Sequence, residues 1–117
     1  MKKSRPKVLE GKTVRVATGC GNLYVTVNRD GGEVFEVFAA LGKAGTCAKV
    51  QSEALTRVIT LALKFGVPME EIVEEIENLI CPSPVWEGGK RILSCPDAIA
   101  KVLRSELEEK SAKRADS

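Results

Sequence analysis

The chain has 117 residues, of which 44% are hydrophobic and 29% charged, as is typical of a single soluble globular domain. Its formal net charge of +2 is too small to indicate nucleic-acid binding, and no apolar run approaches the ~18 residues that span a membrane. The absence of histidine excludes histidine-based catalytic triads and histidine-ligated metal sites.

Residues 1–12 are polar, and we expect a flexible, solvated segment there. Four of them form a basic cluster: Lys2, Lys3, Arg5 and Lys7. This cluster is the only feature that favours a nucleic-acid partner, and it does so weakly. No apolar stretch follows it, so we expect no signal peptide, no membrane association and a cytoplasmic protein.

The next part of the chain predicts a three-stranded antiparallel meander. Residues 13–18, 23–28 and 34–41 alternate between apolar and polar side chains, which is the pattern of half-buried strands. Asp30-Gly31-Gly32 between the second and third strands is a strong hairpin signal.

From residue 46 onward the period of the apolar residues becomes helical. A first helix is predicted from the N-cap residue Thr46 to Gly66, and a second helix opens at Pro68. The core-facing stripe predicted for the first helix is Val50, Ala54, Leu55, Val58, Ala62 and Phe65. That of the second helix is Met69, Ile72, Val73, Ile76, Leu79 and Ile80.

The rest of the chain predicts a proline-rich loop or small hairpin over 81–94, with Trp86 packing near Cys81. A last helix is expected from Pro96 to about Lys110, with a polar, frayed tail over 111–117. The predicted fold class is therefore α+β, with a single domain over 13–110.

Four cysteines, Cys20, Cys47, Cys81 and Cys95, each fall at a junction between predicted elements rather than within an apolar stripe. They contain no CxxC pair, so neither a zinc ribbon nor a thioredoxin motif is present. In a reducing compartment, metal binding by four thiolates is favoured over disulfides. The alternatives are four unrelated buried thiols or a disulfide pair.

Local sequence around the cysteines supports a metal site. Cys47 and Cys95 stand at predicted helix starts, where the helix dipole favours the thiolate form. The residues expected to support the four ligands are Gly19, Gly21, Thr46, Ser94 and Asp97, although ordinary helix capping is the simpler role for Asp97. The sequence predicts a closed, structural zinc site, with an iron–sulfur cluster as the alternative.

A resemblance to a known family rests on three segments: RPKVLEGKTVRVATGCGNLYVTVN, FEVFAALGKAGTCAKVQSEALTRVITLAL and ICPSPVW…SCPDAIAKVL. They resemble the C-terminal domain of adenosylcobalamin-dependent (class II) ribonucleotide reductases, here as a stand-alone chain. This TSCPD domain is named for a Thr-Ser-Cys-Pro-Asp signature, in which Leu93 replaces the threonine and residues 94–97 match. The resemblance runs from about Arg5 to Leu103.

The resemblance implies a link to deoxyribonucleotide synthesis, and hence to DNA synthesis, through ribonucleoside-diphosphate reductase. Those enzymes carry out radical chemistry in a large barrel, for which this chain has no room. It therefore implies no catalytic residue here, no activity of the chain alone and no cobalamin bound to it. The cysteine set carries over: Cys20, Cys47, Cys81 and Cys95.

A fainter likeness links the fold to iron–sulfur scaffold proteins of the NifU type. Cys20, Cys47 and Cys95 match the three cysteines of such a scaffold, while Cys81 is additional. The main hypothesis is a non-catalytic accessory module that folds around zinc and binds a reductase chain, its own copy or nucleic acid. The alternatives are an iron–sulfur carrier, or a thiol-redox electron donor with Cys81 and Cys95 as a pair.

Overall fold

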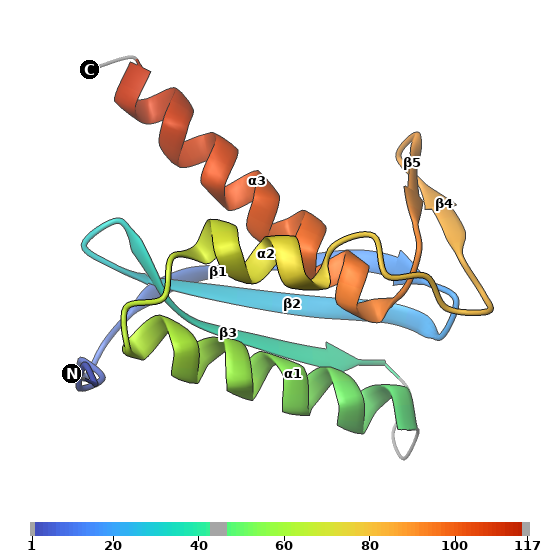
Figure 1. Cartoon of the computed structure of the whole chain (residues 1–117), viewed down its shortest axis with the longest axis horizontal. Coiled ribbons are helices and arrows are strands. Elements are labelled where there is room, and N and C mark those ends of the chain that lie inside the picture. Colours follow the sequence, from blue (N-terminus) through green and yellow to red (C-terminus); the bar gives the residue numbers. More distant parts are fainter. Residues whose placement is uncertain (1, 43–46, 116–117) are drawn as a thin grey trace.

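The computed structural model describes residues 2–42 and 47–115, with side chains as far as Glu109, and these form an α+β fold (Figure 1). The elements, in chain order, are β1 (Glu10–Thr18), β2 (Gly21–Asp30), β3 (Glu33–Leu41), α1 (Cys47–Lys64), α2 (Met69–Ile76), β4 (Val85–Glu87), β5 (Lys90–Ile92) and α3 (Cys95–Ala115). This order confirms the predicted meander, two helices, small hairpin and C-terminal helix.

The main sheet has the antiparallel order β1-β2-β3. Gly31 and Gly32 form the tight turn between β2 and β3 with φ values of 59° and 88°, which glycine adopts without strain. The first strand starts at Glu10, earlier than the predicted residue 13, because Glu10 pairs with Arg29 on β2.

One face of this sheet forms the core. Its buried side chains include Val16, Leu23, Val25, Val27, Val37 and Leu41, and they belong to one cluster with Val73 of α2 and Ile99 and Leu103 of α3. On the opposite face, Tyr24 and Phe38 are exposed. Apolar side chains of α2 and α3 therefore close the core over one face of the sheet.

The predicted stripe of α1 is wrong for most of its members: Leu55 packs against the core as predicted, but hydroxyl side chains occupy much of the face that the helix turns toward the protein. Its buried residues are Ser52, Thr56, Ile59 and Thr60, whereas Val50, Val58 and Phe65 are exposed. The helix runs beside β3, the edge strand of the sheet, and contacts it along its length (Figure 1). A helix in that position faces unpaired backbone groups, which require hydrogen-bonding side chains.

Both edges of the sheet are capped in this way. On β3, the Thr60 hydroxyl accepts a hydrogen bond from the Val37 N–H and donates one to the Val37 carbonyl, both at 3.0 Å. On β1, the Ala17 N–H donates to the carboxylate of Glu87 in β4. The sheet edges are therefore partly closed against pairing with another chain.

The second helix is shorter than predicted. It ends at Ile76, and Asn78 has a φ of 63°, a left-handed conformation that stops a helix. As a result, Leu79 and Ile80 are exposed instead of extending the apolar face of α2. Val73 and Ile76 are buried as predicted.

Two further predictions in the C-terminal half are corrected. Trp86 is 72% exposed rather than packed, because it pairs with Arg91 on the outward side of the β4–β5 hairpin while Ile92 faces inward. The last helix continues to Ala115, past the expected end near residue 110. None of the helices in the described ranges is long and apolar enough to cross a membrane.

We predict that Thr60→Val lowers the free energy of unfolding by about 1–3 kcal/mol, because it leaves the buried N–H and carbonyl of Val37 without partners. Urea denaturation followed by circular dichroism measures this loss. Thr56→Val is the matched control, since the Thr56 hydroxyl donates only to carbonyls of its own helix. An equal loss in both variants would contradict the edge-capping role.

Candidate functional site

The four cysteines lie at the element junctions that the sequence predicts. Cys20 is in the turn between β1 and β2, Cys47 is the first residue of α1, Cys81 lies in the loop after α2, and Cys95 is the first residue of α3. All four thiols are free. Cys95 is buried, Cys81 is half-buried, and Cys20 and Cys47 are exposed.

Thr18 organises the turn that carries Cys20. Its hydroxyl donates to the Gly21 carbonyl at 2.7 Å and accepts from the Cys20 N–H at 3.2 Å. The Cys95 thiol points at the same hydroxyl, with Sγ 3.7 Å from Oγ1. The turn and the start of α3 are therefore joined at one buried threonine, which sequence reasoning did not single out.

The glycines on either side of Cys20 have different geometric roles. A Cβ atom at Gly19 would lie 1.8 Å from the Ser83 carbonyl oxygen, so only glycine lets this turn approach the loop of Cys81. Gly21 has a φ of 119°, which side-chain-bearing residues rarely adopt. Both glycines therefore shape the site through their backbone geometry.

The loop of Cys81 is fixed against the residue before the last helix. The Cys81 N–H donates to the Leu93 carbonyl at 2.9 Å, and the Ser83 N–H points at the Cys81 sulfur at 3.4 Å. This loop therefore brings Cys81 toward Cys95 through backbone contacts.

Ser94 is the N-cap of α3. Its hydroxyl accepts from the Asp97 N–H at 3.1 Å, and its carbonyl accepts from the Ala98 N–H at 2.9 Å. The same hydroxyl donates to the Leu79 carbonyl at 2.5 Å. Ser94 therefore fixes both the start of the helix and the segment that follows α2.

Asp97 does more than the ordinary capping expected of it. Its fully buried carboxylate accepts from the Asn78 N–H at 2.8 Å and from the Leu93 N–H at 2.9 Å, and it forms an ion pair with Lys101 at 2.6 Å. Burial alone would raise the pKa of this carboxyl, but the three donors hold that pKa below its usual value. Asp97 thus connects three segments, through contacts to backbone N–H groups and to Lys101 rather than to a thiol.

Three of the cysteines line one cavity of about 170 Å³. Its wall consists of Cys20, Ala48, Gln51, Ser52, Cys81, Ser94, Cys95 and Pro96. Desolvation raises the pKa of the Cys20 thiol. The neighbouring thiols of Cys95 and Cys81 raise this pKa further. Neighbouring thiols have this effect because two thiolates repel each other.

Ser52 is the second residue that sequence reasoning missed. It is buried, it lines the thiol cavity, and its hydroxyl has no hydrogen-bond partner among the described residues. A buried, unpartnered hydroxyl costs free energy unless something in the cavity bonds to it. The spacing of Ser52, Thr56 and Thr60 at every fourth residue was the signal that these hydroxyls share one helix face.

The fourth predicted ligand stands apart from the other three. Cys47 does not line the cavity, although the next residue, Ala48, does. The predicted N-cap Thr46 lies outside the described residues. Among the residues that are described, no three Cys, Asp or Glu side chains stand close enough to hold a metal ion.

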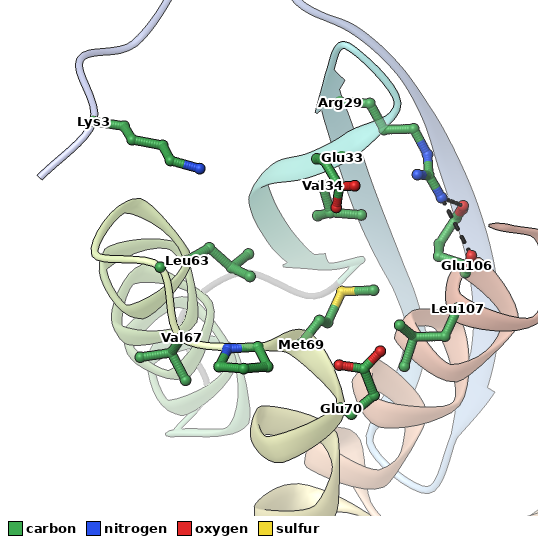
Figure 2. A pocket seen from close by; sticks show the side chains of 12 residues that line it. Lys3, Arg29, Glu33, Val34, Leu63, Val67, Met69, Glu70, Glu106 and Leu107 are labelled. Carbon is green, nitrogen blue, oxygen red and sulfur yellow. Dashed lines mark hydrogen bonds and ion pairs between the residues drawn. The ribbon is translucent and has the colours of Figure 1, made fainter. Parts of the chain in front are cut away.

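A larger cavity of about 290 Å³ lies elsewhere (Figure 2). It is lined by the end of α1, the start of α2, the start of β3 and part of α3. Buried Glu106 in its wall forms ion pairs with Arg29 and Lys12. Burial alone would raise the pKa of Glu106, but these two cations hold it below its usual value. The two cations thereby neutralise the buried charge of Glu106, and no cysteine lines this cavity.

Comparison with known proteins gives one family. The family model described as the TSCPD domain matches residues 1–107. No curated protein and no solved structure matches the chain significantly. The match covers β1 to β5, the thiol cavity and the part of α3 that contributes to the core.

We predict that Asp97→Asn lowers the free energy of unfolding at pH 7 by roughly 2–4 kcal/mol, because buried hydrogen bonds to a charged group are among the strongest. Since the folded-state pKa of Asp97 is depressed, its contribution is complete above the unfolded pKa of about 3.9 and is lost as pH falls through the folded value.

Urea denaturation of both proteins between pH 7 and pH 3 measures this difference. The difference in free energy of unfolding between wild type and Asp97→Asn should become smaller toward pH 3. Glu109→Gln, which alters an exposed carboxylate, is the control and should change little. A difference in free energy of unfolding that does not depend on pH would show that the charge of Asp97 does not stabilise the site.

Proposed function

The chain belongs to the TSCPD domain family, and from that premise we propose that it is a non-catalytic, metal-binding accessory module related to adenosylcobalamin-dependent ribonucleotide reductase. Its cysteines would hold a structural zinc ion and stabilise a domain that binds the reductase catalytic chain. The observation that carries the proposal is the convergence of Cys20, Cys81 and Cys95, from three separate segments, on one cavity.

The chemistry of the cavity fits a soft metal ion. Thiolates are the ligands that zinc takes in closed structural sites, and the described chain offers no histidine to compete with them. A bound cation would reverse the effect that raises the pKa of Cys20, because it stabilises thiolates. The unpartnered Ser52 hydroxyl would gain a partner in such a site, because it can donate to a metal-bound thiolate sulfur.

Cys47 is the fourth ligand in this proposal. It directly precedes Ala48 in the cavity wall, so the first turn of α1 is the nearest source of another thiol. Zinc binding would supply a cross-link between α1, the β1–β2 turn, the loop of Cys81 and the start of α3. Since the thiols are not at metal-binding distances as they stand, binding includes closure of the site.

An iron–sulfur carrier is the second candidate function. The exposure of Cys20 and Cys47 favours it, since a cluster that is transferred to another protein requires solvent access. The thiol-redox alternative predicted Cys81 and Cys95 as the pair, and both line the cavity. Cys20 lines the same cavity, so it would compete for the same disulfide.

We predict that protein purified without oxygen contains about one zinc ion per chain and has no visible absorption bands. Elemental analysis together with an absorption spectrum tests this. Iron with visible bands would favour the carrier instead. Absence of metal together with a reversible disulfide would favour the redox role and contradict both metal proposals.

We also predict that Cys95→Ser and Cys47→Ser each lower zinc affinity by more than the roughly 10- to 100-fold typical of an outer-shell change. Cobalt substitution measures this, because thiolate–cobalt charge-transfer bands should weaken in each variant. Ser105→Ala, at an exposed position of α3, is the control. Unchanged bands in Cys47→Ser would remove Cys47 from the ligand set.

Zinc affinity should fall as pH is lowered, since protons compete for the thiolates and the pKa of Cys20 is raised in the free protein. Competition with a chromophoric chelator at several pH values measures the slope. An affinity that does not change with pH would argue against thiolate ligands.

A further inference from the structure

Ser52 of α1 lies in the wall of the thiol cavity and has a buried hydroxyl without a hydrogen bond. The residue is 2% exposed, and its hydroxyl has no partner among the described residues. The thiols of Cys20, Cys81 and Cys95 line the same cavity. The Ser52 hydroxyl has therefore lost its contacts with water without gaining one in the protein, which costs free energy.

The other two buried hydroxyls on α1 are satisfied. Thr60 exchanges two hydrogen bonds with the backbone of Val37, and Thr56 donates to carbonyls of its own helix. A helical serine commonly does the same, by donating to the carbonyl four residues before it. Ser52 makes no such bond, so its hydroxyl can donate to a group inside the cavity.

The position of Ser52 is fixed by contacts that involve no thiol. Its carbonyl accepts from the Thr56 hydroxyl at 3.1 Å, and Thr60, two helical turns further along α1, is held at the edge of β3. The start of α3, which carries Cys95, is fixed by the helix cap that Ser94 forms. The hydroxyl and this thiol thus come from separate elements, and each is held in the cavity wall by its own anchor.

We propose that Ser52 is a positioning residue of the metal site, and that its hydroxyl donates a hydrogen bond to the sulfur of a metal-bound thiolate. This inference rests on the proposed function, because a neutral thiol is a weak acceptor whereas a thiolate is a charged one. Hydrogen bonds to metal ligands orient them and typically contribute about 10- to 100-fold to metal affinity. Ser52 would thereby connect the middle of the inner face of α1 to thiols of other segments, separately from Cys47.

This role predicts effects of opposite sign with and without metal. In the metal-free protein, Ser52→Ala removes a buried hydroxyl that has no partner, so the urea midpoint should rise. In the metal-bound protein, the same substitution removes a hydrogen bond to a ligand, so zinc affinity should fall by about 10- to 100-fold. A hydroxyl that only supported the fold would instead lower the urea midpoint of the metal-free protein when it is removed.

Urea denaturation of the metal-free chain and zinc competition with a chromophoric chelator measure the two effects. Ser105→Ala is the matched control, because it makes the same change at an exposed position of α3 and reproduces the gain in helix propensity. The urea midpoint should rise more in Ser52→Ala than in Ser105→Ala, and only Ser52→Ala should weaken zinc binding. Ser52→Thr keeps the hydroxyl and should bind zinc more tightly than Ser52→Ala does.

Cobalt substitution gives a spectroscopic readout that a purely structural role would not change. A thiolate that loses a hydrogen bond releases electron density to the metal more readily, so the thiolate–cobalt charge-transfer band of Ser52→Ala should move to longer wavelength. The band should keep its intensity, whereas loss of a ligand in Cys95→Ser should weaken it. Ser105→Ala should leave both the position and the intensity of the band unchanged.

The outcomes separate the role of Ser52 from the metal site itself. A wild-type chain that binds neither zinc nor cobalt would overturn both proposals. Equal zinc affinity in wild type and Ser52→Ala would overturn the role of Ser52 alone and leave the metal site standing. A metal-free Ser52→Ala protein with a lower urea midpoint than wild type would also overturn it, because the hydroxyl would then support the fold.

Discussion

The unpaired edge of β3 is the constraint on which the placement of the other elements depends. The N–H and carbonyl of Val37 point away from the sheet into a region that excludes water, and Thr60 satisfies both at 3.0 Å. A helix with an apolar inner face could not do this. The edge thus requires hydroxyl side chains from α1, and α1 must lie beside the sheet rather than across its face.

This constraint also sets the wall of the thiol cavity. Thr60 and Ser52 are two helical turns apart on the same face of α1, so the contact that fixes Thr60 at the sheet edge directs Ser52 toward the cysteines. The same rotation of the helix turns Val58 and its neighbours outward. A single hydrogen-bonding requirement therefore determines both the lining of the cavity and which apolar side chains of α1 are exposed.

The strands, their turns and the junction positions of the cysteines could be predicted because their signals are local. Glycine pairs define the hairpins, and alternation defines the strands. The orientation of α1 could not be predicted from its apolar period, because that period does not say which face meets the protein. Spacing alone also could not show that Cys20, Cys81 and Cys95 converge, since Thr18, Leu93 and Gly19 arrange this through contacts between distant segments.

The signature at residues 94–97 contains residues whose polar groups hold the fold and one cysteine whose thiol lines the cavity. Ser94 uses its hydroxyl for the helix cap and for Leu79, and Asp97 uses both carboxylate oxygens for backbone and Lys101. Pro96 suits the first turn of α3. Cys95 belongs to the buried core cluster, but its thiol contacts Thr18 at 3.7 Å and lines the cavity, so it is the member of the signature that is placed for chemistry there.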